Sequence, residues 1–151
     1  MTATNHALTG ASVGLIMGDA ALAIPIAFLS HYVLDALPHF GPNGNDQDWI
    51  KSKKFKTMLI ADALLCLVLV AVMVILQPHN WFLACLCAFM AASPDLFWLN
   101  RFIRVHLKKP WQPSLLSKFA SFIQWFQRPI GVVVEVTWAV AAIIVISNVI
   151  K

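Results

Sequence analysis

Long apolar runs separated by short polar interruptions make up most of the chain and predict helices that cross a membrane. The clearest run covers residues 55–76 and has about the twenty residues that a helix needs to cross the hydrocarbon core. We expect five membrane helices in an all-α bundle, over residues 2–17, 20–37 and 55–76, from residue 81 with an interruption at 93–95, and over 129–150.

Short polar segments mark where these helices begin, turn and end. Asp19 follows a glycine and is expected to cap the second helix, which contains Pro25. Residues 41–54 are rich in Gly, Pro, Asn, Asp and Lys and predict a solvated loop. Residues 77–80 predict a tight turn, in which His79 is read as a polar loop residue.

Glycines recur every four residues along the first helix and place a smooth stripe on one of its faces. His6 begins this stripe, and Gly10, Gly14 and Gly18 continue it. Small residues at this spacing let the backbone of another helix approach closely. We expect His6 to be pressed against a neighbouring helix, and the alternative is a frayed, solvated residue near a chain end.

The chain becomes amphipathic after Asp95. Arg101, Arg104 and Lys108 share one helical face at the membrane margin, where basic side chains commonly just extend to the headgroups. Apolar residues then recur at helical period over residues 114–128, which predicts one helix lying in the membrane interface. Gln124 is the polar residue of that helix that lies near enough to the last membrane helix to be noted.

Composition supports an integral membrane protein with one domain over residues 1–151. Hydrophobic residues make up 60% of the chain and charged residues 12%, about half the charged fraction of soluble domains, and the mean hydropathy is +0.75. The three cysteines lie in apolar runs without a metal-binding spacing. The first segment lacks a basic region and contains glycines, so we read it as part of the fold rather than as a removable signal.

Positive charge is strongly asymmetric along the chain. Ten of the eleven Lys and Arg residues fall in segments that five crossings place on one side, namely Lys51, Lys53, Lys54, Lys56, Arg101, Arg104, Lys108, Lys109, Lys118 and Arg128. The positive-inside rule makes that side cytoplasmic. We therefore expect a multi-pass protein of the inner (plasma) membrane, surrounded by lipid bilayer, with a cytoplasmic N-terminus, an external C-terminus and no nucleic-acid partner.

Residues 30–40 read SHYVLDALPHF and place three potential metal ligands four residues apart in an apolar segment. His31 and Asp35 share one helical face, and His39 can follow them if the helix continues or relaxes just past Pro38. Ionisable groups inside a membrane segment are costly, so a functional site is the default hypothesis. The alternative is a helix end whose polar groups reach interfacial water.

Three further carboxylates are expected at the same depth. Ser93 and Pro94 interrupt the fourth helix and deliver Asp95 beside protein or a watery cavity, because a broken helix is tolerated only there. The alternative is that Asp95 merely caps the next helical segment. Asp62 lies about 10 Å into the third helix, and Glu135 lies near the inner start of the last. Together with the histidines, these acids form a common layer in the cytoplasmic half, as a metal site requires.

The motifs resemble those of a known family. Residues 5–10 (NHALTG), 30–40 and 92–95 (ASPD) resemble segments of the bacterial membrane-bound metal-dependent hydrolases, inner-membrane proteins that are similar to zinc-dependent phospholipase C. The resemblance covers most of the chain, and residues 30–40 are its specific part. It implies a metal site whose ligands are His6, His31, Asp35 and Asp95, to which the spacing adds His39.

The chain departs from larger members of that family, because residues 40–60 contain no second histidine cluster. The site therefore holds fewer metal ions, or carboxylates replace imidazoles, or the activity is lost. Two or three histidines with several carboxylates suit Zn²⁺, and Mn²⁺ or Mg²⁺ are alternatives.

These observations predict a metal-dependent hydrolase for a phosphoester, with a lipid or lipid-linked phosphate at the cytoplasmic leaflet as substrate. Glu135, or next Asp62, is expected to act as general base. Arg101, Arg104 and Lys108 are expected to attract the anionic headgroup. One alternative is a small membrane transporter or ion-conducting subunit, since broken helices and buried carboxylates also occur in transporters. Another is a catalytically inactive structural membrane protein.

Overall fold

The chain is built from helices throughout the residues that its computed structural model describes, which are 1–41, 46–110 and 112–151. These ranges contain no β-strand, and one isolated bridge pairs His39 with Gln127. The expected all-α class is therefore confirmed.

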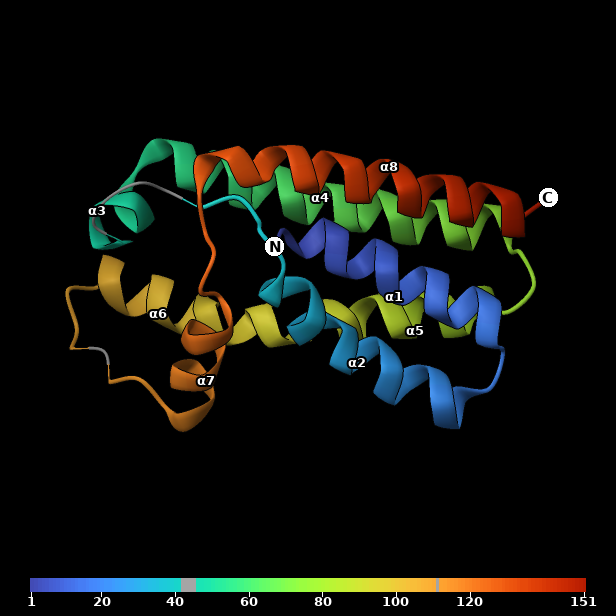
Figure 1. Cartoon of the computed structure of the whole chain (residues 1–151), viewed down its shortest axis with the longest axis horizontal. Helices are drawn as coiled ribbons and strands as arrows, with labels where there is room; N and C mark the ends of the chain where they lie inside the picture. The colour runs from blue at the N-terminus through green and yellow to red at the C-terminus, as the bar shows by residue number, and fades with distance from the viewer. Residues whose placement is uncertain (42–45, 111) are drawn as a thin grey trace.

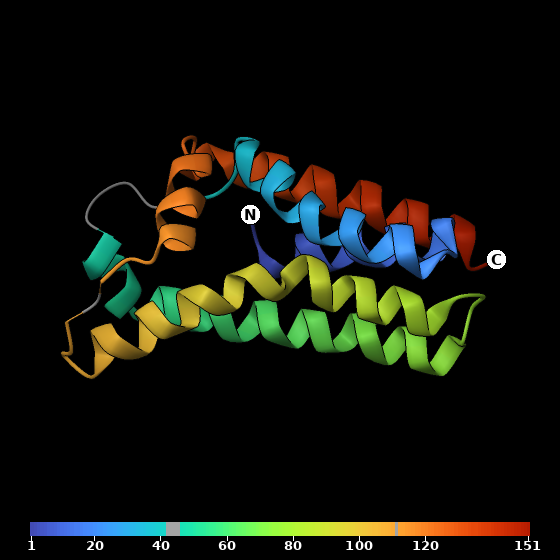
Figure 2. The ribbon, with the colours of Figure 1, turned by 90° about the horizontal axis from the view of Figure 1, so that it is seen from below.

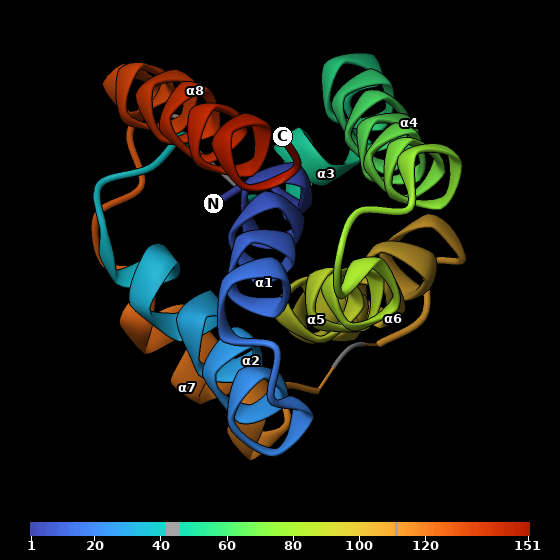
Figure 3. The ribbon, with the colours of Figure 1, turned by 90° about the vertical axis from the view of Figure 1, so that its right-hand side faces the viewer.

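Helix α1 (Ala3–Met17) is the centre of the bundle. Four helices surround it in the end-on view of Figure 3, which are α2 (Ala20–Ala36), α4 (Lys53–Leu76), α5 (Trp81–Ala92) and α8 (Val132–Val149). The two helices of the α1–α2 hairpin are joined by Gly18 and Asp19, and the Asp19 carboxylate accepts a hydrogen bond from the Ala21 amide at 2.9 Å. The expected cap of the second helix is thus confirmed.

The glycine stripe of α1 packs directly on the backbone of α5. A Cβ atom at Gly10 would lie 2.2 Å from the carbonyl oxygen of Cys87, and one at Gly14 would lie 2.6 Å from the Cα of Ala84. Both separations are far below van der Waals contact, so only glycine allows the two helices to come this close. The stripe brings His6, at its beginning, into the interior, where the ring is fully buried.

The interruption at Ser93 and Pro94 is a tightened turn rather than a break. Residues Ser93–Asp95 form the 3₁₀ turn η1, and α6 (Leu96–His106) continues from it. Figure 2 shows α5 and α6 following one another in a single bent course beside α4. The tighter winding of the 3₁₀ turn changes the side of the helix on which Asp95 lies, and the chain remains helical through it.

Within the described residues, three helical segments are long and apolar enough to cross a membrane, which are Lys53–Leu76, Trp81–His106 and Pro129–Val149. Their side chains are largely exposed on the outside of the bundle, as lipid-facing helices require. The expected count of five is not reached, because α1 has 15 residues and α2 has 17. At about 1.5 Å per residue both are shorter than the hydrocarbon core of about 30 Å.

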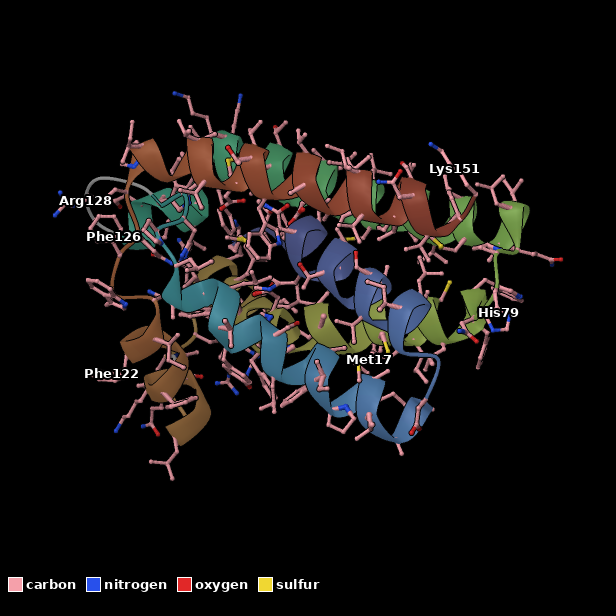
Figure 4. The ribbon with its side chains drawn as sticks, turned by 45° about the vertical axis from the view of Figure 1, so that its right-hand side comes forward. Met17, His79, Phe122, Phe126, Arg128 and Lys151 are labelled. Carbon is pink, nitrogen blue, oxygen red and sulfur yellow. The ribbon has the colours of Figure 1, made fainter. Side chains whose placement is uncertain are left out.

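One end of the molecule carries the short helices and nearly all the basic residues. Figure 1 places α3 (Asp46–Lys51), α6 and α7 (Leu115–Ile123) together at this end, and Figure 4 shows Phe122, Phe126 and Arg128 there, far from Met17, His79 and Lys151. The predicted helix over residues 114–128 is present as α7, which is shorter, and its place in the membrane interface stays a prediction. The expected solvated loop over 41–54 is partly wrong, because it contains α3 and the start of α4, while residues 42–45 lie outside the described ranges.

Candidate metal site

Side chains from three elements converge in the interior at the basic end of the bundle. His6 comes from α1, His31 from α2 and Asp95 from η1, and one ligand atom of each lies within 4.8 Å of the others. Both histidines are buried, while the Asp95 side chain is 28% exposed. We call these three residues the ligand cluster.

The His31 ring is held in one orientation by the backbone of α5. Its Nδ1 atom lies 2.8 Å from the Ala91 carbonyl oxygen and must donate the hydrogen bond, because a carbonyl can only accept. In the neutral ring, Nε2 therefore carries the free electron pair. That atom lies 3.4 Å from Asp35 Oδ2 and 3.9 Å from Asp95 Oδ1. In the neutral ring a nitrogen lone pair thus faces two carboxylates, and in the protonated ring an N–H group does.

His6 stacks on His31, with 3.9 Å between ring centroids and 25° between ring planes. Its Nε2 lies 3.1 Å from Asp35 Oδ1. Its Nδ1 is buried and has no hydrogen-bond partner among the described residues. A buried ring nitrogen without a partner is costly, and a metal ion is one of the groups that can satisfy it.

Asp35 links the two histidines and is itself buried. It lies one helical turn after His31, as the four-residue spacing predicts, and contacts both rings. Its Oδ1 also pairs with the Met1 amino group, and its Oδ2 accepts a hydrogen bond from Gln124 Nε2 at 2.7 Å. Asp35 therefore joins α1, α2 and the segment after α7.

Asp95 does not cap the helix that follows it. Its side chain makes no capping hydrogen bond to α6, and the Ser93 hydroxyl donates to the Met90 carbonyl oxygen at 2.9 Å instead of capping a new helix. The alternative reading of Asp95 as a capping residue is thus wrong. The carboxylate is left facing His31.

The donor set and its spacing fit a zinc ion. Two donor atoms, each about 2.1 Å from a tetrahedral zinc, lie about 3.4 Å apart. The 3.4 Å between His31 Nε2 and Asp35 Oδ2 matches that value, and the 3.9 Å between His31 and Asp95 is slightly larger. Imidazole nitrogen with carboxylate oxygen is also a donor combination that zinc accepts.

His39 lies apart from the ligand cluster. Helix α2 ends at Ala36, because Leu37 precedes a proline and adopts the extended conformation that this position favours. His39 therefore leaves the four-residue spacing. Its Nδ1 donates to the Leu37 carbonyl oxygen at 2.8 Å, and its Nε2 lies 3.1 Å from the amide nitrogen of Gln127. Both ring nitrogens have partners, so the structure does not bring His39 to the cluster.

Asp62 and Glu135, the expected general bases, hold the beginning of the chain. Asp62 accepts hydrogen bonds from the backbone amides of Ala3 and Thr4 at 2.8 and 2.9 Å and from the Thr4 hydroxyl. Glu135 accepts from the amides of Thr2 and Phe40, both at 3.1 Å. The carboxylates that were expected to act as general bases are thus engaged with the protein's own backbone.

The basic residues expected to bind a headgroup lie along α6 and just beyond its end. The Arg101 guanidinium stands 5.1 Å from the centre of the Trp98 ring. Arg104 bonds to Asn100 and to the Pro110 carbonyl oxygen, and Lys108 is exposed. At about 1.5 Å per residue, Arg101 stands about 9 Å along the helix from Asp95, and the other two stand farther away.

A small cavity lies beside His31. Its walls come from α2, η1, α6 and α7, and its lining consists of His31, Tyr32, Pro94, Phe97, Trp98, Ser117 and Ala120. Among the ligand cluster only His31 lines it, and Phe97 in its wall is about half exposed.

Several groups of the site were missed by sequence reasoning. The Ala91 carbonyl oxygen, which orients His31, carries no sequence signal at all. Gln127 and Asn5 were also missed, although amide side chains beside apolar runs could have marked both. Gln124 was noted for its position, and it is the residue that reaches Asp35.

Comparisons of this chain with protein-family models, with curated proteins and with solved structures find no match.

Proposed function

We propose that His6, His31 and Asp95, with Asp35, hold a divalent metal ion, most favourably zinc, in a membrane-embedded hydrolase for phosphoesters. The observation that carries the proposal is the convergence of electron-pair donors. With Nδ1 of His31 committed to Ala91, its Nε2 faces Asp35 Oδ2 and Asp95 Oδ1 at 3.4 and 3.9 Å. A cation between them relieves their mutual repulsion.

The chemistry of such a site is metal-assisted hydrolysis. A divalent ion bound there lowers the pKa of a water molecule toward neutrality and offsets charge that develops on phosphoryl oxygens. The protein's contribution is to fix the imidazoles, His31 through Ala91 and His6 through Asp35. The burial of both histidines keeps bulk water away from the reacting group.

A lipid or lipid-linked phosphate is the substrate class that the surroundings favour. The cavity beside His31 is lined in part by α6 and α7, and apolar side chains of α7 are strongly exposed, with Leu115 at 84% and Phe122 at 79%. A short amphipathic helix such as α7 lies in the membrane interface. Arg101 on α6 and Lys118 on α7 add positive charge to these two helices, which attracts an anionic headgroup.

The test begins with metal content. Protein purified in detergent should retain about one zinc per chain in elemental analysis, and His31→Ala should lose it. Hydrolysis of a lipid phosphomonoester in mixed micelles should need the metal and exceed hydrolysis of soluble p-nitrophenyl phosphate. Protein that binds no Zn²⁺, Mn²⁺ or Mg²⁺ would exclude the proposal.

A second function is favoured by the same geometry. A proton on His31 would also bridge the two carboxylates, as in proton-coupled transporters and ion-conducting subunits. In that case His31→Gln would abolish proton-driven flux in reconstituted vesicles, while the metal content of the wild-type protein would be zero. The elemental analysis therefore separates the two functions.

A further inference from the structure

The first turn of α1 lacks a capping residue of its own. Thr2 occupies the N-cap position in an extended conformation, but its side chain makes no capping hydrogen bond. The first amides of a helix need acceptors from elsewhere. Asp62, on α4, supplies them by accepting from the amides of Ala3 and Thr4 at 2.8 and 2.9 Å.

A second carboxylate extends this arrangement. Glu135, on α8, accepts from the Thr2 amide at 3.1 Å, and one of its oxygens lies 3.3 Å from the side-chain nitrogen of Asn5. Four successive residues before His6 are thus fixed to α4 or α8. Both carboxylates are also favourably placed at the positive end of the helix dipole.

His6 is the next residue of α1, but its side chain contacts α2 rather than α4 or α8. Its ring stacks on His31 and reaches Asp35, both on α2. Its Nδ1 has no partner among the described residues, so the ring itself makes few directional contacts. The position of the backbone that carries His6 therefore depends on α4 and α8. The positions of His31 and Asp95 depend on α2 and η1.

We propose that Asp62, supported by Glu135, is a positioning residue for the metal site and acts through His6. A metal site requires its ligands within about 0.5 Å of their productive positions. The ends of a helix fray when their amides lack acceptors. The proposal rests on the proposed function, and it gives Asp62 the role of placing a ligand rather than removing a proton.

The chain offers a matched control for this role. Asp19 also caps a helix through one carboxylate, but it stands at the start of α2, about 18 Å along the helix from His31. Asp62→Ala and Asp19→Ala each remove a helix cap. Only Asp62→Ala is expected to change the position of His6.

The experiment titrates Co²⁺ into the full chain in detergent and follows the visible absorption spectrum. Asp62→Ala should weaken Co²⁺ binding at least tenfold and change the absorption bands, while Asp19→Ala should leave affinity and bands unchanged at a comparable loss of thermal stability. Asp62→Asn keeps one acceptor oxygen and should lie between wild type and Asp62→Ala. It also serves as the test variant if Asp62→Ala does not fold.

The NMR signals of the His6 ring give a readout that needs no metal. They should shift in Asp62→Ala, or in Asp62→Asn if that variant replaces it, and not in Asp19→Ala. Equal Co²⁺ affinity and unchanged His6 signals in the Asp62 variants would overturn the inference. Wild-type protein that binds no Co²⁺ would instead count against the metal site, and the His6 signals would then decide on positioning alone.

Discussion

His31 donates a hydrogen bond from Nδ1 to the carbonyl oxygen of Ala91 over 2.8 Å. This contact joins residues 60 positions apart and leaves Nε2 as the ring atom that faces the carboxylates. A backbone acceptor behind a histidine is the arrangement that orients metal ligands in many proteins. The ligand cluster thus depends on how α2 packs against α5.

Removing either member of the four-residue pair on α2 should abolish metal retention. His31→Ala deletes a nitrogen donor, and Asp35→Ala deletes the carboxylate that contacts both rings. Elemental analysis of purified protein provides the measurement. His79→Ala, in the exposed turn between α4 and α5, is the control and should keep the metal content of wild type. Equal metal content in all three variants would contradict the ligand assignment.

Gly10→Ala should disturb both stability and the site. The added Cβ would stand 2.2 Å from the Cys87 carbonyl oxygen, so α1 and α5 must separate. Overpacking of this kind costs about 1–3 kcal/mol. Because His6 is on the same stripe, metal affinity should fall together with the melting temperature. Ala141→Val, at an exposed position of α8, adds volume without such a clash and should change neither quantity.

Glu135→Gln distinguishes a carboxylate that holds backbone amides in place from a general base. The amide keeps one acceptor oxygen but turns an NH₂ group toward the amide of Thr2 or Phe40, so about 1–3 kcal/mol of stability should be lost. A general base at this position would instead lower hydrolysis by roughly 10²- to 10⁴-fold with metal and stability retained.

Metal stoichiometry, turnover of a lipid phosphate and thermal stability should be measured on that single variant. Asp48→Asn, on the exposed side of α3, is the matched change of carboxylate to amide. A Glu135→Gln protein that equals the control in all three measurements would show that Glu135 has no part in the site.

His39 should make stability depend on pH. Burial lowers its pKa below the usual 6.5, so the folded state binds fewer protons than the unfolded state when the pH falls through that value. Stability should therefore be intact above pH 6.5 and decline below it, by up to about 1.4 kcal/mol per pH unit. The difference in melting temperature between wild type and His39→Gln, followed as the pH falls, measures the contribution of His39 to stability. His79→Gln, which removes an exposed histidine, should not alter the slope.

The ten-to-one asymmetry of basic residues predicts the orientation in the membrane. A reporter fused after Lys151 should be external, and one inserted near Gly44, outside the described ranges, should be cytoplasmic. Opposite labelling would place the basic end, and with it the cavity beside His31, at the outer leaflet.

Local pattern alone determined the helices and several of their contacts. The apolar run that predicts a helix over 55–76 is α4, and the run from Trp81 to Ala92 is α5. The glycine stripe predicted close packing of α1, and the spacing of His31 and Asp35 predicted a shared face. These features depend on backbone periodicity, which holds in any helix regardless of what surrounds it.

The tertiary structure decided which polar groups meet. Depth along the helices placed Asp62 and Glu135 in the same layer as the histidines, but depth says nothing about direction around the bundle. Packing turned these two carboxylates toward the amides of residues 2–4, and it turned Asp95 toward His31. The orientation of His31 and the pairing of His39 with Gln127 likewise depend on contacts between segments 60 or more residues apart. A single sequence does not specify such contacts, because they arise only when the helices pack around α1.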